Sequence, residues 1–167
     1  MKLFVTSPSM RSLALASMVL LGACSKKEDD AAPAAATTGV SWTADGTNYT
    51  SASANVAVQS TIMTITGIST ANSSNNTISL FVPAAAGTYS TTGAPASANY
   101  LMSYNVGSSS TGTVYVASNL LVKGTGTVTV TTFSATEVIG TFSFTGDNQS
   151  GGTGTKVVTN GKFNVKR

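Results

Sequence analysis

The chain has 167 residues, of which 41% are hydrophobic and only 9% are charged, and it contains no histidine. Serine and threonine supply 23 and 27 residues, whereas the strong helix formers Leu, Glu, Lys, Arg and Gln are scarce. This composition excludes a helical protein and a charge-rich disordered chain, and the lack of histidine excludes Ser-His-Asp and Cys-His catalysis. It is typical of pleated sheets joined by tight turns.

The first 23 residues predict an export signal. Lys2 and Arg11 are the only charged residues before position 26, and a short apolar run, Leu13–Leu21, follows them. A positive segment, a short apolar run and small residues in that order are typical of a signal peptide. The apolar run is about half of the ~20 residues that a transmembrane helix needs, so a membrane span is the weaker interpretation.

The residues that end this segment, Leu21-Gly22-Ala23-Cys24, resemble the lipobox of bacterial lipoproteins. The resemblance implies that residues 1–23 are removed and that Cys24 is acylated and anchors the protein to a membrane. The alternative is an ordinary signal peptide that happens to be followed by a cysteine. Cys24 is the only cysteine, so it can form no internal disulfide, and lipidation accounts for its presence.

Residues 24–38 predict a flexible tether between this anchor and the rest of the chain. A charged run opens it and an alanine- and proline-rich stretch, residues 31–38, follows without hydrophobic anchors. The charged run resembles the surface-export signal of Bacteroidota lipoproteins, and its residues are Lys26, Lys27, Glu28, Asp29 and Asp30. The residue after Cys24 is serine rather than aspartate, which implies the outer membrane. We therefore expect a lipid-anchored protein that faces the cell exterior, with a simple spacer on the periplasmic side as the alternative.

Residues 39–167 predict one all-β domain. Apolar residues alternate with Thr, Ser, Asn or Ala along most of this region, and turn-rich stretches separate the alternating segments. Asp45-Gly46 predicts the first hairpin turn, whereas the inward face of Thr61–Thr66 stays ambiguous. The residues expected to face inward are Val40, Trp42, Ala44, Val56, Val58, Ile78, Leu80, Val82, Tyr100, Met102, Tyr104, Val114, Val116, Val128, Val130, Phe142 and Phe144. The pattern indicates an antiparallel sandwich or barrel of about ten short strands.

The C-terminal part of this region carries a family resemblance. Gly140-Thr141-Phe142-Ser143-Phe144, the final Thr159-Asn160-Gly161-Lys162-Phe163 segment and the upstream Gly87-Thr88-Tyr89 are similar to an uncharacterised family of small β-rich Bacteroidota lipoproteins. The match extends over residues 40–166. It implies a fold and a compartment, and it implies no activity.

The rest of the sequence contains few residues that could form a nucleic-acid, catalytic or metal site. Without Lys2 and Arg11 the nine basic residues become seven, against six acidic ones, so the net charge of about +1 argues against nucleic-acid binding. The expected domain holds three carboxylates, and Glu137 and Asp147 flank one strand roughly 30 Å long, which is too far for a catalytic pair. A pair of Asp45 with either of them stays open but has no supporting motif. Asp147–Gly152 offers oxygen ligands for calcium, but one carboxylate favours an ordinary turn. We expect no metal site and no cofactor.

Two tyrosines are the best candidates for a ligand contact. Tyr115 lies out of phase with Val114 and Val116, and Tyr49 follows a turn, so both are expected at the surface, where they could stack on sugar rings. We expect a non-catalytic binding module for glycans or another envelope protein, since polar loops on rigid sheets commonly carry recognition. The alternative is a structural scaffold of the envelope without a soluble ligand, and an enzyme is the least favoured reading. The sequence leaves the oligomeric state open.

Overall fold

The computed structural model describes residues 38–71, 74–107 and 112–167, and within them every regular element of four or more residues is a β-strand. Eleven strands follow one another along the chain: β1 (Gly39–Ala44), β2 (Thr47–Thr50), β3 (Ser53–Gln59), β4 (Ile62–Ser69), β5 (Asn76–Pro83), β6 (Gly87–Ser90), β7 (Leu101–Val106), β8 (Thr113–Ser118), β9 (Thr125–Phe133), β10 (Glu137–Asn148) and β11 (Thr155–Lys166). All the strand pairs are antiparallel, which confirms the predicted fold class. The described residues contain no helix with the length and hydropathy of a membrane span.

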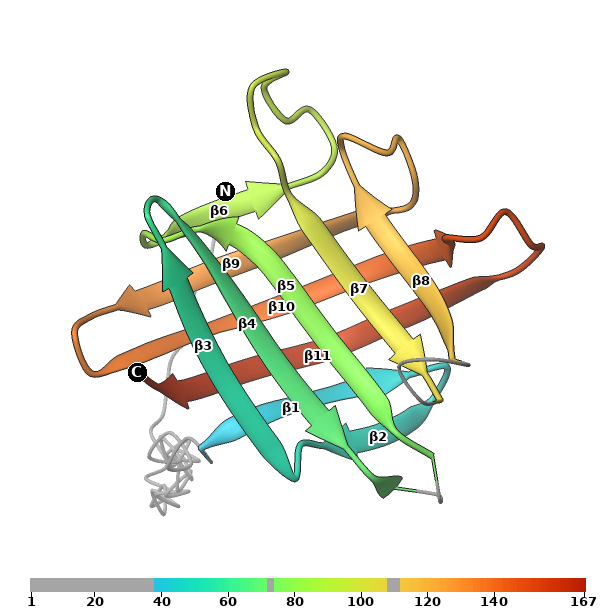
Figure 1. Ribbon diagram of the computed structural model, residues 1–167, viewed down its shortest axis with the longest axis horizontal. Helices are drawn as coiled ribbons and strands as arrows, with labels where there is room; N and C mark the ends of the chain where they lie inside the picture. The colour runs from blue at the N-terminus through green and yellow to red at the C-terminus, as the bar shows by residue number, and fades with distance from the viewer. Residues whose placement is uncertain (1–37, 72–73, 108–111) are drawn as a thin grey trace, which may run out of the picture. The chain divides into compact units, whose positions relative to one another are not determined.

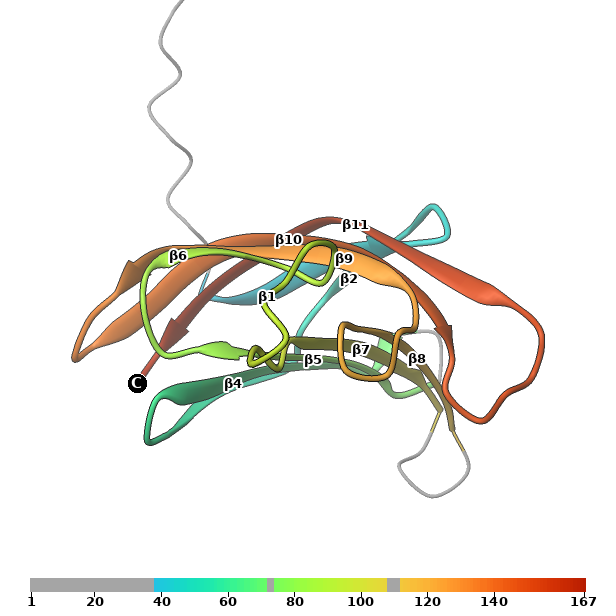
Figure 2. The same ribbon diagram turned by 90° about the horizontal axis from the view of Figure 1, so that it is seen from above.

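The strands form one continuous sheet that curls into two layers. One layer holds β6, β9, β10, β11, β1 and β2, and the other holds β8, β7, β5, β4 and β3. Among the strands that the structure describes, the backbone pairing between the two layers is that of the end of β10 with β8, through Asp147 opposite Val116 and Asn148 opposite Tyr115. Figure 1 shows the strands of one layer crossing those of the other, and Figure 2 shows both layers curving around the space between them.

The core fills the space between the layers because each strand sends alternate side chains inward. Trp42, Leu80 and Phe163 are examples, each at most 2% exposed. In Thr61–Thr66, the segment whose inward face is ambiguous in the sequence, Met63 and Ile65 of β4 point into the core. The remaining large side chains that are almost completely buried are Val40, Ile78, Val82, Met102, Val116, Val128 and Val138.

Close approach of the layers explains one glycine in β4. A Cβ atom built on Gly67 would lie 2.5 Å from the Cβ of Val40 in β1, so no other residue fits between these strands. The predicted first hairpin turn is confirmed, since Asp45 and Gly46 both adopt positive φ values, 45° and 83°, as a type I′ turn requires.

The predicted phase of β8 is wrong. Tyr115 lies directly opposite Tyr104, and Ala117 lies opposite Met102, so the register with β7 puts Tyr115 and Ala117 on the core side. Val116 is buried but lies on the other face. A strand that is covered on both sides has no polar face, and alternation then cannot tell the core side from the outer side.

Tyr100 also departs from its expected place. It precedes β7 rather than belonging to it, and its backbone N–H donates to Oδ1 of Asn119 over 2.8 Å. Its ring is half-buried against Tyr89, with 5.5 Å between the ring centroids.

Candidate functional site

An open hollow of about 340 Å³ lies on the outer face of β9, β10 and β11, beside β6. Its lining is dominated by hydroxyl groups, on Ser90, Thr92, Thr125, Thr127, Ser143, Thr145 and Thr159. Gly126, Phe144, Val157 and Val158 complete the lining. None of these eleven residues carries a charge. We call this feature the hydroxyl hollow.

Strand register aligns the hydroxyl groups in rows. Ser90 lies opposite Thr127, and Thr127 lies opposite Ser143 in the next strand. A second row holds Thr125 opposite Thr145. Residues that lie directly opposite share a face, with Cβ atoms about 4.5–5.5 Å apart, and alternate residues along one strand point the same way. The hydroxyl hollow therefore arises from alternation in strands whose intervening residues fill the core.

A β-bulge shapes one side of the hydroxyl hollow. In the pairing of β10 with β11, Phe142 lies opposite Gly161 but Phe144 lies opposite Val158, so Ser143 faces two residues of β11, Thr159 and Asn160. Asn160 takes a φ of 53°, a value that asparagine tolerates better than most residues. Such a bulge bends its strand and increases the local twist.

The lining suits a neutral ligand that is rich in hydroxyl groups. Each Ser or Thr hydroxyl can donate one hydrogen bond and accept others, which matches the hydroxyl groups of a sugar. Val157, 45% exposed, adds an apolar surface for the C–H face of a ring. Activation of a serine or threonine nucleophile needs a neighbouring base, and the lining residues include none. The lining residues therefore offer a ligand hydroxyl groups and a small apolar surface.

A second group of residues surrounds Lys156 at the start of β11. Its ammonium forms an ion pair with Asp45, and the carboxylate of Asp45 also accepts the backbone N–H of Val157 over 3.1 Å. The hydrogen bond from Lys156 lowers the pKa of Asp45, and the same bond raises the pKa of Lys156. Both groups are therefore charged at neutral pH, and Lys156 is no nucleophile there.

Both predicted ligand contacts, Tyr49 and Tyr115, lie in this Lys156 cluster. The ammonium of Lys156 lies 5.8 Å from the centroid of the Tyr115 ring, and Tyr49 contributes to the raised pKa of Lys156. Tyr49 stacks on Trp42 with 5.5 Å between the centroids, so one face of its ring is covered. Both tyrosines lie beside Tyr104, since the Tyr49 ring is 6.3 Å from that of Tyr104 and Tyr115 lies opposite Tyr104 in the next strand, and both are half-buried.

The third tyrosine beside them is part of the core. The hydroxyl of Tyr104 donates to Oδ1 of Asn76 over 2.7 Å, and both residues are 2% exposed. Burial raises the pKa of Tyr104, and the neighbouring hydroxyl of Tyr49 raises it further. Tyr104 is therefore neutral at physiological pH.

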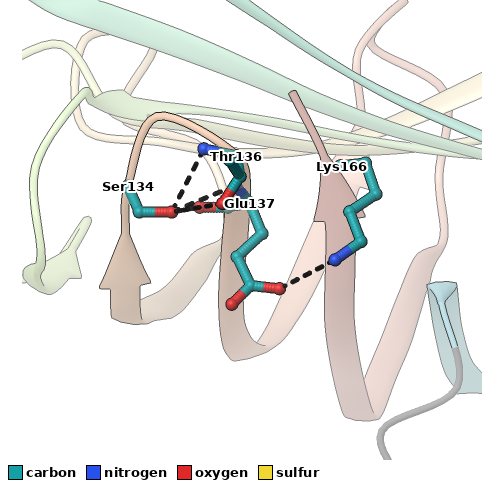
Figure 3. A network of polar contacts seen from close by, with 4 residues as sticks. All are labelled: Ser134, Thr136, Glu137 and Lys166. Atoms are coloured by element: carbon teal, nitrogen blue, oxygen red, sulfur yellow. Dashed lines mark hydrogen bonds and ion pairs between the residues drawn. The ribbon is translucent and has the colours of Figure 1, made fainter.

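The carboxylates of the described residues lie in three separate contacts, and Asp45 is the first. Glu137 pairs with Lys166 over 3.2 Å at the turn between β9 and β10. In that turn Oγ of Ser134 accepts the backbone N–H groups of Thr136 and Glu137, as Figure 3 shows. Asp147, at the other end of β10, accepts the backbone N–H of Gly124 over 2.7 Å.

The loop Asp147–Gly152, which offers oxygen ligands for calcium, forms an Asx-type turn. Oδ1 of Asn148 accepts the backbone N–H of Ser150 over 3.0 Å. The ammonium of Lys123 donates to the carbonyl of Asn148 over 2.9 Å, which places a cation on an oxygen that calcium would need. In the part of the chain that the structure describes, no three His, Cys, Asp or Glu residues are grouped as metal ligands.

The anchor and export residues lie outside the described residues; they are Cys24, Lys26, Lys27, Glu28, Asp29 and Asp30. Sequence reasoning missed the hydroxyl hollow as a site. A signal for it exists in the alternating threonines of Thr125–Thr129 and in Ser143-Phe144-Thr145. That signal becomes a site only when the pairing of β6, β9, β10 and β11 is known.

Together these features define an all-β domain with an uncharged, hydroxyl-lined hollow on its outer face. Residues 36–165 match the family model described as a domain of unknown function (DUF6252), and the chain belongs to that family. No curated protein and no solved structure matches the chain.

Proposed function

We propose that this protein is a lipoprotein of the outer membrane that faces the cell exterior and binds neutral glycans, without catalysis, in the hydroxyl hollow. The membrane location rests on the likeness of Leu21-Gly22-Ala23-Cys24 to a lipobox and of Lys26–Asp30 to the export signal of Bacteroidota lipoproteins. The binding role rests on the seven hydroxyl groups and the uncharged lining of the hollow.

The size of the hollow argues for weak binding that gains strength from repetition. A volume of about 340 Å³ is at the lower end of the range for ligand sites. Many anchored copies in one membrane, together with the repeating units of a polysaccharide, raise the effective affinity by roughly 10²–10⁴-fold without new contacts. A modest hollow on a surface-anchored domain is therefore adequate for adhesion to a polymer.

Paired threonine-to-valine substitutions test the binding site. Thr127→Val with Thr145→Val removes two hydroxyl groups from the hollow and keeps the side-chain shape. Thr129→Val with Thr141→Val makes the same change in the same strands two and four residues away, on the same outer face but outside the hollow. The full-length protein, purified in mild detergent, is applied to an array of neutral and acidic oligosaccharides.

The Thr127/Thr145 pair is expected to lose affinity for neutral oligosaccharides, whereas the Thr129/Thr141 pair is not. Two hydrogen bonds of about 0.5–1.5 kcal/mol each correspond to a loss of roughly 5–150-fold in affinity for a neutral oligosaccharide. The Thr129/Thr141 control stays within about twofold of the unsubstituted protein. Equal loss in the two pairs, or binding by acidic oligosaccharides alone, would contradict the assignment to the hydroxyl hollow.

The anchor has its own test. Mass spectrometry of the membrane fraction should find an N-terminal Cys24 peptide that carries at least two acyl chains, since one chain gives only marginal binding. Cys24→Ala should release the protein from the membrane. Protease treatment of intact cells should degrade the domain, and replacement of Lys26–Asp30 by neutral residues should protect it. A Cys24→Ala protein that stays bound would contradict the anchor.

A second candidate is a role in envelope assembly, and the edge of the sheet favours it. β3 has seven residues without a charged side chain, and among the described strands its one partner is β4. An open edge of this kind can accept a strand from another chain. Asn55→Lys with Ala57→Lys puts charges on two exposed positions of β3. Loss of an envelope partner in this variant, with glycan arrays silent, would favour assembly over glycan binding.

A further inference from the structure

The turn between β8 and β9 exposes three consecutive aliphatic side chains. Leu120, Leu121 and Val122 are 56%, 49% and 89% exposed, and the only other large hydrophobic side chain with such exposure among the described residues is Val157. A domain that buries its apolar residues elsewhere has an energetic reason to avoid such a cluster. An exposed apolar patch of this kind marks an interaction surface.

The turn is held rigidly in this exposed state. Ser118 and Lys123 exchange both backbone hydrogen bonds, over 2.7 Å and 3.2 Å, and the N–H of Leu121 donates to Oγ of Ser118. Val122 adopts a φ of 49°, which is strained for a β-branched residue. Strain that persists in a well-bonded turn indicates that the surrounding structure enforces the conformation, which is common at functional segments.

A neighbouring loop extends the apolar surface. The side chain of Asn119 accepts the N–H of Tyr100 over 2.8 Å and donates to the carbonyl of Ala98 over 2.7 Å, which ties the β8–β9 turn to the β6–β7 loop. Figure 1 shows both loops protruding at the same end of the domain. We call Leu120–Val122 together with Ala94–Ala96 the apolar tip; neither segment contains a charged residue.

We propose that the apolar tip docks into the lipid bilayer to which the protein is anchored, an inference that rests on the proposed lipid anchor at Cys24. The tip protrudes, as the exposure of Val122 shows, so it fits a deformable apolar medium better than a preformed pocket. The residues that dominate the binding energy of protein interfaces are mostly Trp, Tyr and Arg, and Leu and Val are under-represented among them. A bilayer takes up Leu and Val side chains, which carry no polar group that would need a partner there.

The length of the chain before the domain allows this docking. The 14 residues between Cys24 and Gly39 can span at most about 50 Å, whereas β9, whose first residue follows the tip closely, is about 30 Å long. The anchor and the tip can therefore reach the same membrane whichever end of the domain the tether enters. Thr92 and Thr125 of the hydroxyl hollow are two and three residues from the tip, so docking holds the hollow close to the membrane surface.

Site-specific labelling tests the docking because Cys24 is the only cysteine in the sequence. In the acylated protein Val122→Cys supplies the single free thiol, which takes an environment-sensitive fluorophore. The labelled protein is reconstituted into phosphatidylethanolamine and phosphatidylglycerol vesicles that contain nitroxide-labelled acyl chains. A probe that sits about 5–10 Å inside the boundary of the acyl region should lose half or more of its fluorescence, a decrease of about twofold.

Probes at other positions show whether the quenching by lipid is confined to the apolar tip. Ala135→Cys is exposed in the turn at the other end of β9, and a probe there should stay unquenched. Leu121→Cys is a second probe site in the tip, should Val122→Cys fold poorly, and should be quenched like it. Leu120→Gln with Leu121→Gln in the Val122→Cys protein should reduce the quenching toward the Ala135→Cys value.

The outcomes separate the docking from the anchor. Vesicle flotation that Cys24→Ala abolishes supports the anchor, and an unquenched tip probe in floated protein then overturns the docking alone. Shielding of the tip probe that grows with protein concentration, without quenching by lipid, indicates a second copy or another protein and also overturns it. If the unsubstituted protein does not float, the proposed anchor is wrong and the docking fails with it.

Discussion

The two faces of β9 and β10 differ completely although they are built from the same two strands. Val128, Val130, Phe142 and Phe144 point into the core, whereas the residues between them give the outer face its hydroxyl groups. The inner side chains hold the layers together through buried apolar area, at roughly 25 cal/mol per Å². The outer ones add little to stability and are free to meet a ligand. Substitutions on the two faces should therefore change different measurable quantities.

The largest decrease in the free energy of unfolding is expected when a large side chain is removed from the inner face. Phe163→Ala removes a ring that is 2% exposed and lies 6.4 Å from the ring of Phe142, centroid to centroid. The cavity should lower the free energy of unfolding by about 3–5 kcal/mol. Lys162→Ala, one residue away on the outer face, should change it by less than about 0.5 kcal/mol. Urea unfolding followed by the fluorescence of the single buried tryptophan, Trp42, measures both.

A smaller decrease in the free energy of unfolding is expected at the buried polar contact of the inner face, between Tyr104 and Asn76. Tyr104→Phe removes the donor that satisfies Oδ1 of Asn76, and a buried acceptor without its donor costs about 1–3 kcal/mol. The pKa of Tyr104 is raised above its ordinary value of 10.0, mainly by burial. The folded state thus keeps a proton that the unfolded chain loses, so its stability is complete below pH 10 and falls above it. Tyr104→Phe should flatten that alkaline loss; an unchanged alkaline slope would show that another group causes it.

A substitution in the apolar tip is expected to raise the free energy of unfolding rather than lower it. Val122→Gly replaces a β-branched residue at a φ of 49° by one that adopts this conformation freely, and should raise the free energy of unfolding by about 1 kcal/mol. Thermal unfolding of the two proteins side by side measures the gain. A loss of stability would mean that the valine side chain packs in the turn, which its 89% exposure argues against.

The smallest effect is expected at the Lys156 cluster. Asp45→Asn breaks an ion pair whose partners are 42% and 32% exposed, so the loss should stay below about 1 kcal/mol and shrink with added salt. Lys156 lowers the pKa of Asp45 below its ordinary value of 3.8, so this contribution is present above that pH and is lost below it. The substituted and unsubstituted proteins should therefore differ at pH 7 and converge in acid. A difference that persists at pH 2 would point to the hydrogen bond with Val157 instead.

Alternation along single strands was enough to predict much of the inner face. Trp42, Val130 and Phe144 lie in the core as expected because their neighbours in sequence are polar, and the Asp45-Gly46 turn follows from local turn chemistry. The same rule failed at Tyr115, whose neighbours Val114 and Val116 are apolar. There the register with β7 decides the phase, and no local pattern contains that register.

The sites depend on contacts that are remote in the sequence. Asp45 and Lys156 are 111 residues apart, and Thr91 joins β9 through Gly126, 35 residues away. Pairing of this kind is selected by the whole sheet, since a strand such as β10 pairs with β9, β8 and β11 along its length. Composition showed that hydroxyl groups were abundant, and only the pairing shows where seven of them meet.

Threonine methyl groups offer the most direct test of the hydroxyl hollow. The full-length protein is titrated with a neutral oligosaccharide that the array selects, while the methyl resonances of its threonines are followed by NMR. Glycan binding in the hollow predicts that the resonances of Thr125, Thr127 and Thr145 shift together and saturate. Those of Thr129 and Thr141, on the same face, should stay in place. Saturable shifts that arise at Thr129 and Thr141 while the three hollow threonines are unaffected would contradict the account.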